Sequence, residues 1–61
     1  MKTNTTHIFK GIAVTSTSVL DMQEHIAHWE EHGFEVQTKQ SFCAILHHAG
    51  LDEIVILELV D

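Results

Sequence analysis

Four side chains with metal-binding chemistry recur along one predicted helix: Asp21, His25, His28 and His32. An α-helix turns by about 100° per residue, so their spacing of four, three and four residues places them on one narrow stripe. Histidines one turn apart can share zinc or another transition metal, and a carboxylate can complete such a site. The stripe is about 16 Å long at a rise of 1.5 Å per residue, too long for one ion to reach every group. We favour a solvated histidine-rich face, with a metal site as the alternative.

Other reactive side chains give little indication of catalysis. Cys43 is the single cysteine, which excludes an internal disulfide, and in the apolar run FCAIL a lone thiol is usually a small core residue. His47 and His48 are adjacent in a predicted strand and point to opposite faces. The glutamates of the helix have no evident partner that would prepare a carboxylate for acid–base work. The sequence therefore predicts a non-enzymatic protein.

The histidine stripe requires a helix, which we predict over residues 18–34. Ser18 is a suitable N-cap, and Gly33 can end the helix in a left-handed conformation. Phe34 is then expected to contact Trp29, one turn back. The predicted apolar face of this helix consists of Val19, Met22, Ile26 and Trp29.

Four strands are predicted around the helix, at residues 7–15, 34–39, 42–48 and 53–60. Residues 1–5 are polar and expected to be disordered. Gly11 is interpreted as a bulge or a close backbone approach within the first strand, and Gly50 as a positive-φ residue in the last hairpin. Residues 54–57 are apolar on both faces and should lie inside the sheet, whereas residues 34–39 are better suited to its edge.

The resulting order, β-α-β-β-β, predicts a single α+β domain over residues 1–61. One helix would pack on one face of a small mixed or antiparallel sheet, forming two layers. A chain of this length buries only roughly 60 % of the surface that its unfolded form exposes, so a metal or a partner subunit would help to stabilise it.

Apolar side chains alternate onto both faces of the predicted strands, but one helix can cover only one face. A second exposed apolar face is unusual for a soluble monomer. We therefore expect the helix-free face to bind a second copy, most simply as a twofold dimer, or another protein. Coverage of that face by loops is the alternative. The expected interface residues are Phe9, Cys43, Ile45, Val55, Leu57 and Leu59.

The charge balance limits the classes of partner. Three Lys and Arg residues against nine Asp and Glu give a formal charge of −6, which disfavours nucleic acids and anionic membranes. No apolar run reaches the roughly 18 residues of a membrane span, and the first residues show no signal-peptide core, so a cytoplasmic location is expected. We expect an inhibitor or adaptor module, with a metal-binding protein as the alternative and a ligand binder with a pocket between subunits as a third hypothesis.

One segment resembles a known family. The resemblance rests on Leu20, Asp21, Ala27, Trp29 and the run from Gly33 to Val36, with Cys43 displaced by one residue. They resemble the helix and following strand of very small phage inhibitors of bacterial RNA polymerase. Basic residues follow this stretch in that family, whereas Thr38 and Gln40 stand there in this chain. The shared positions are mainly core and helix-ending residues, so we carry over no function.

The six histidines make solubility sensitive to mild acid. Full protonation of these side chains would cancel the formal charge of −6. We expect light scattering of a concentrated sample to rise steeply between neutral and mildly acidic solution, because loss of net charge promotes association. Constant scattering over this range would contradict the prediction.

Overall fold

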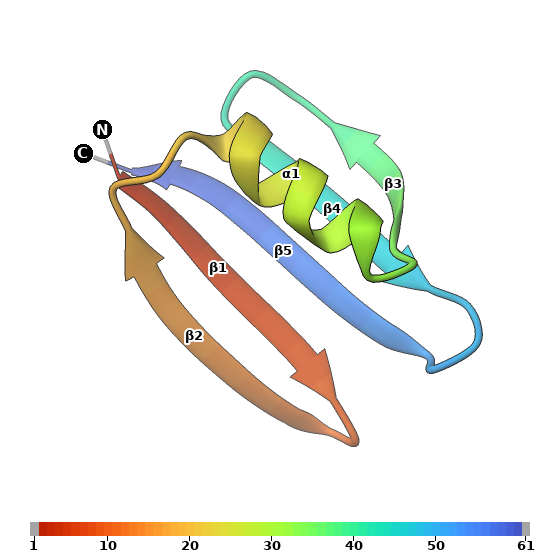
Figure 1. Ribbon diagram of the computed structural model, residues 1–61. Helices are drawn as coiled ribbons and strands as arrows, with labels where there is room; N and C mark the ends of the chain where they lie inside the picture. The colour runs from red at the N-terminus through yellow and green to blue at the C-terminus, as the bar shows by residue number, and fades with distance from the viewer. Residues whose placement is uncertain (1, 61) are drawn as a thin grey trace.

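One β-hairpin, one helix and a three-stranded antiparallel meander make up the fold, which the computed structural model describes for residues 2–60 (Figure 1). The elements are β1 (Lys2–Phe9), β2 (Ile12–Ser18), α1 (Met22–Glu31), β3 (Glu35–Lys39), β4 (Cys43–His48) and β5 (Glu53–Val60). The strand order is β2-β1-β5-β4-β3, and every neighbouring pair is antiparallel. The fold is α+β as predicted, but its element order is β-β-α-β-β-β.

The predicted first strand is wrong, because the chain reverses in its middle. Lys10 and Gly11 have φ values of 50° and 76°, and two positive φ values in succession are typical of a type I′ hairpin turn. Phe9 therefore pairs with Ile12, and Gly11 forms part of a turn rather than a bulge. In the last hairpin the positive φ of 52° belongs to Asp52, not to Gly50.

The sequence predicts disorder for residues 1–5; residue 1 lies outside the described residues, and residues 2–5 form the first half of β1. Their polar side chains pair with those of β2, where Thr17 Oγ1 donates to Asn4 Oδ1 at 2.7 Å. Thr3 is fully buried, and its Oγ1 donates to the carbonyl oxygen of Leu20 at 2.9 Å. Threonine is β-branched and favours strands without adding an apolar pattern, which explains why the sequence pattern did not reveal this hairpin.

The helix begins later than predicted. Asp21 is the N-cap and accepts a hydrogen bond from the Gln23 amide at 3.0 Å. Ser18 instead ends β2, where its Oγ accepts from the Leu20 amide. Val19 consequently lies outside the helix and is 79 % exposed, so it does not belong to the apolar face.

The end of the helix is confirmed in detail. Gly33 has a φ of 90° and donates to the carbonyl oxygen of Glu30 at 3.0 Å, while the Phe34 amide donates to that of Trp29 at 3.1 Å. These two bonds form a Schellman motif, which satisfies the last helical carbonyls. The Trp29 and Phe34 rings meet edge to face with centroids 5.2 Å apart.

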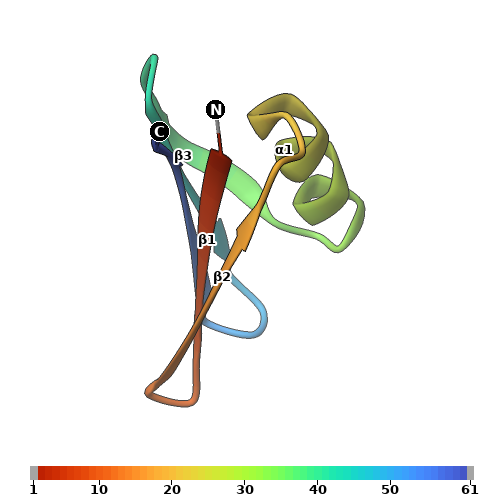
Figure 2. The same cartoon turned by 90° about the vertical axis from the view of Figure 1, so that its left-hand side faces the viewer.

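The core lies between α1 and the middle of the sheet. It consists of Met22, Ile26, Phe34, Ala44, Leu46, Val55 and Leu57. β5 is the central strand and β3 an edge strand, as predicted. A side view shows the helix on one side of the sheet (Figure 2). In the described part of the chain, no helix has the length and hydropathy needed to cross a membrane.

Substitution at Gly33 should destabilise the fold more than the same change at Gly11. A Cβ at Gly33 would lie 2.8 Å from His48 Nε2, whereas one at Gly11 would meet nothing within 4 Å. Both residues have positive φ, which costs a non-glycine residue about 1–2 kcal/mol, so only the steric contact distinguishes them. Urea denaturation should show a larger loss of unfolding free energy for Gly33→Ala than for Gly11→Ala. Equal losses for the two variants would contradict the packing of Gly33 against His48.

Candidate functional site

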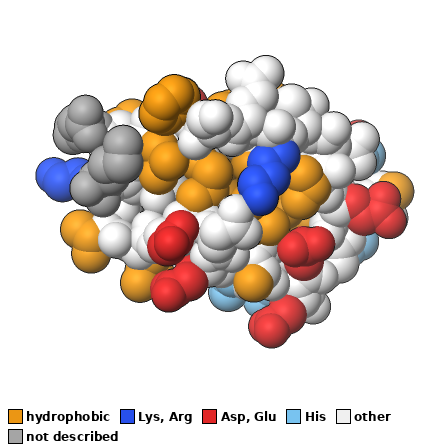
Figure 3. Space-filling view, turned by 90° about the horizontal axis from the view of Figure 1, so that it is seen from above, with side chains coloured by type: hydrophobic (Ala, Val, Ile, Leu, Met, Phe, Trp, Pro, Cys, Tyr) orange, Lys and Arg blue, Asp and Glu red, His pale blue; other side chains and the backbone are white. Residues whose placement is uncertain are grey.

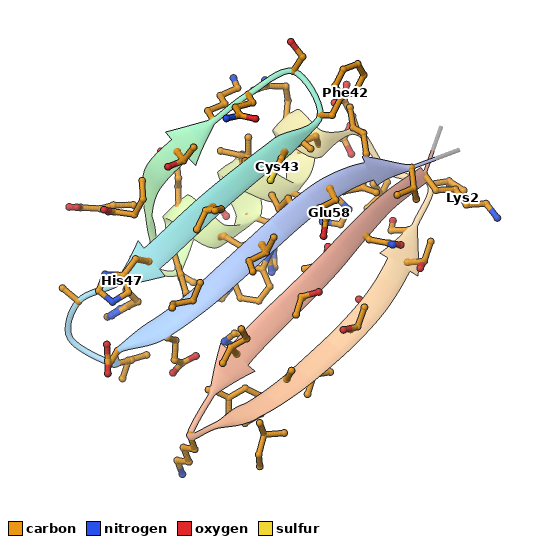
Figure 4. All side chains as sticks on the ribbon, turned by 180° about the vertical axis from the view of Figure 1, so that it is seen from behind. Lys2, Phe42, Cys43, His47 and Glu58 are labelled. Atoms are coloured by element: carbon orange, nitrogen blue, oxygen red, sulfur yellow. The ribbon has the colours of Figure 1, made fainter. Side chains whose placement is uncertain are left out.

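Four isoleucines from three adjacent strands meet on the sheet face opposite α1, which we call the open face. Ile8 of β1 pairs with Ile54 of β5, and Ile45 of β4 pairs with Ile56 of β5. Figure 4 views the molecule from this side. Ile54 is exposed and the other three are half-buried, so the chain itself does not cover this apolar cluster. The open face therefore has the apolar centre that a protein interface requires.

Polar side chains frame the isoleucines at both ends of the open face. Glu58 pairs across the sheet with Asn4 on one side and Cys43 on the other. His47 lies toward the opposite end, and its Nε2 is 3.3 Å from Asp52 Oδ1. An apolar centre with a polar rim is the usual anatomy of a protein–protein interface.

The predicted interface set combines residues from both faces and is corrected here. Val55 and Leu57 are fully buried beneath α1, and Leu59 packs against the same core. Phe9 also lies on the helix side, where its ring is 4.9 Å from that of His7. Of the predicted set, Cys43 and Ile45 belong to the open face.

Strand register explains this error. Leu57 pairs with Ala44 and Val55 with Leu46, so these four side chains share the helix side. Alternation assigns residues to two faces within each strand. It does not indicate which face of one strand matches which face of the next, and a slip of one residue exchanges the two.

The two edges of the sheet differ in how well they resist further pairing. β3 is short, carries Glu35 and Lys39 and has an irregular register between Val36 and Thr38, features that discourage strand addition. β2 pairs regularly along its length, has no charged residue and exposes Ile12 and Val14. The side of the molecule where β3 and α1 lie, seen from above in Figure 3, shows hydrophobic groups among acidic and basic side chains. The edge at β2 is thus a second apolar surface.

The histidine stripe is only partly assembled as a metal site. His28 and His32 lie one turn apart with ring centroids 4.7 Å from each other. Asp21 instead caps the helix, and His25 turns toward the sheet and is half-buried. Among residues 2–60, no group of three or more His, Cys, Asp or Glu side chains could hold a metal ion. A metal at His28 and His32 would need ligands from outside the described residues.

A groove of about 440 Å³ lies between α1 and the β2 side of the sheet. Its lining includes Thr5, Leu20, Glu24, His25, His28 and Trp29. The sequence pattern did not predict it, because Thr5 belongs to the segment expected to be disordered and Leu20 to the predicted helix. His25 and His28 were singled out, but as part of a solvated stripe.

Three buried polar atoms lack hydrogen-bond partners within the described chain: Thr5 Oγ1, His25 Nε2 and Trp29 Nε1. Each atom is buried, and each belongs to a residue that lines the groove. A buried polar group without a partner costs free energy, so such atoms are uncommon in folded proteins. The three residues line the groove, while the unpaired atoms themselves are closed to solvent.

His7 and Glu53 form a second polar pair that the sequence pattern did not indicate. His7 Nε2 lies 2.5 Å from Glu53 Oε1, although the residues are 46 positions apart. The His7 ring is also 4.9 Å from that of Trp29, so it supports the indole from the sheet side. We infer that the His7–Glu53 pair is a positioning contact, because the His7 ring that it holds supports the Trp29 indole, which forms one wall of the groove.

Comparison of the chain with protein-family profiles, curated proteins and solved structures finds no match.

Thr3 and Thr5 offer a matched test of the unpaired hydroxyl. Both are buried on the helix side of β1, but only the Thr3 hydroxyl has a hydrogen-bond partner. Thr5→Val should leave stability unchanged or raise it, because it removes an unsatisfied polar group at nearly constant shape. Thr3→Val should cost about 1–2 kcal/mol, because it leaves the Leu20 carbonyl unpaired. Equal losses of unfolding free energy for Thr3→Val and Thr5→Val, measured by thermal and urea denaturation, would contradict this assignment.

Proposed function

We propose that this chain is a small, acidic, non-enzymatic interaction module of inhibitor or adaptor type, and that its open face binds a second copy of itself. The observation that carries the proposal is the meeting of Ile8, Ile45, Ile54 and Ile56 on a sheet face without a covering helix. Burying this cluster against an equal surface would remove apolar area from water at roughly 25 cal/mol per Å².

Twofold symmetry supports a second copy as the occupant. An axis across the strands at the level of Ile45 and Ile56 would place the isoleucine pairs of the two copies against each other. The same axis would bring the Glu58 end of one copy toward the His47 end of the other. A carboxylate would then lie near an imidazole, a side chain that can carry a positive charge.

The formal charge of −6 supports a protein partner over nucleic acid or an anionic membrane. The free thiol of Cys43 is compatible with the cytoplasmic location that forms part of this proposal. The close approach of His28 and His32 favours transition-metal binding as a second candidate function. Native mass spectrometry with zinc, comparing the chain with His28→Ala, tests that candidate separately.

Ile54→Glu should dissociate the dimer. Ile54 and Val36 are both 36 % exposed, but Val36 pairs with Leu46 and so belongs to the helix side. A charge at Ile54 would be buried without a partner in the interface, so we expect dimer affinity to fall at least about 30-fold in sedimentation equilibrium. Val36→Glu is the matched control and should leave the affinity nearly unchanged.

Val14→Lys distinguishes the open face from the β2 edge. Lysine on an edge strand opposes strand addition. Circular dichroism should show that all three variants remain folded. A chain that is monomeric at about 1 mM, or a dimer that Val14→Lys disrupts and Ile54→Glu does not, would overturn the proposal.

A further inference from the structure

The outer edge of β2 carries a row of backbone groups that the described chain leaves without partners. Within residues 2–60, β2 lies at one end of the sheet and pairs only with β1 (Figure 1). Its hairpin turn closes on the Phe9–Ile12 pair, and the closing pair of a two-residue hairpin exchanges backbone hydrogen bonds. Such pairs alternate with non-hydrogen-bonded pairs along an antiparallel ladder. The N–H and C=O groups of Ala13, Thr15 and Thr17 therefore point away from β1.

An extended peptide chain is the ligand that matches this row. Every second residue of an extended segment directs its N–H and C=O groups to the same edge, at the spacing of the β2 residues. A helix uses these groups internally and cannot supply them. β2 also lacks the features that discourage strand addition, because its register is regular and it has neither a charged residue nor a proline.

The helix side of β2 favours apolar side chains on the added segment. Val14 pairs with His7, whose ring contacts that of Trp29, so Val14 lies on the helix side of the sheet. Ile12, two residues earlier in the strand, lies on the same side. Val14 and Ile12 are 50 % and 56 % exposed. Apolar side chains placed beside them on a neighbouring strand would bury this area as cross-strand pairs.

Charge adds a basic residue and fixes its place. The formal charge of −6 attracts a cationic segment. Ser16, the next helix-side residue after Val14, lines the same groove as Glu24. A long basic side chain beside Ser16 can extend over this small residue toward the Glu24 carboxylate. At the other end of β2 the turn carries Lys10, which would repel a second cation.

We propose that β2 adds an extended segment of a partner protein as a further antiparallel strand, bound through the backbone of Ala13, Thr15 and Thr17. In the direction of its chain, this segment has a basic residue beside Ser16 and then apolar residues beside Val14 and Ile12. Antiparallel pairing is slightly more stable per residue than parallel pairing. The site lies at the sheet edge and does not rest on the dimer proposed for the open face.

Hydrogen exchange of the edge amides tests strand addition directly. The probe is the peptide acetyl-Thr-Lys-Thr-Val-Thr-Ile-amide, whose threonines are placed opposite Ala13, Thr15 and Thr17. It is titrated to about 5 mM into the ¹⁵N-labelled chain, because so short a segment is expected to bind weakly. At saturation, exchange of these three amides should slow at least about fivefold, while the amides of β3 should not change.

Two methylated peptides separate backbone pairing from other modes of binding. N-methylation of the middle threonine removes the N–H group that would donate to the Thr15 carbonyl, so this peptide should give no protection. N-methylation of the valine alters an N–H group that points away from β2, so binding should weaken less than about threefold. The two peptides have the same charge and composition.

A matched pair of variants locates the site on the chain. Val14→Lys should weaken peptide binding at least about tenfold, because it places a charge on the edge strand beside an apolar side chain of the peptide. Val19→Lys makes the same change of charge at a residue beyond the strand that is 79 % exposed, and should have little effect. Ile54→Glu should leave peptide binding unchanged, so failure of the proposed dimer and failure of this site are distinguishable.

The proposal is overturned if the peptide protects none of the three edge amides, or if the two methylated peptides bind alike. Equal effects of Val14→Lys and Val19→Lys would also overturn it. So would protection of these amides in the peptide-free chain that disappears on dilution, because the edge would then be occupied by a second copy.

Discussion

Packing of one ten-residue helix on a five-stranded sheet is the constraint on which the rest of this structure depends. Met22 and Ile26 of α1 bury the middle of β4 and β5, where Leu46, Val55 and Leu57 lie fully inside. The helix is too short to cover the β2 side of the sheet and lies on one face only. Both candidate sites follow from this limited coverage, since one lies on the uncovered face and the other at the margin of the helix.

Two caps fix the helix at this length. Asp21 begins it and the Schellman motif at Gly33 ends it, so the chain between β2 and β3 must cross the sheet from one edge to the other. The connection at Val19 and Leu20 enters this crossing from the β2 edge. The groove lies on that side, where Leu20 and the first turns of α1 face Thr5. The same geometry leaves the hydroxyl of Thr5 unpaired, whereas that of Thr3 reaches the Leu20 carbonyl.

The sequence predicted features that depend on strong local signals. Gly33 and Phe34 ended the helix as expected, and the two-sided apolar run of residues 54–57 lies in the central strand. The β1–β2 hairpin was missed because its threonine-rich strands lack an apolar alternation and its turn uses Lys10 and Gly11 rather than Asn-Gly. The interface set failed at Val55 and Leu57 because register is a property of paired strands.

The groove also depends on tertiary structure, and for that reason local sequence patterns could not predict it. Its lining joins Thr5 to Trp29, which are distant in sequence and approach through the unpredicted hairpin and the helix crossing. Likewise, His7 and Glu53 meet only because β1 pairs with β5. Local patterns identified His25 and Trp29 as notable residues, but only the tertiary structure shows that both line the same groove.

Intermolecular contacts between isoleucine methyl groups test the central claim most directly. In an equal mixture of isotope-labelled and unlabelled chains, a filtered nuclear Overhauser experiment detects only contacts between copies. We expect such contacts among the methyls of Ile45, Ile54 and Ile56, because the open face would be covered by the same face of a second copy. Their absence at a concentration where the diffusion coefficient shows a dimer, or contacts restricted to Ile12 of β2, would contradict the account.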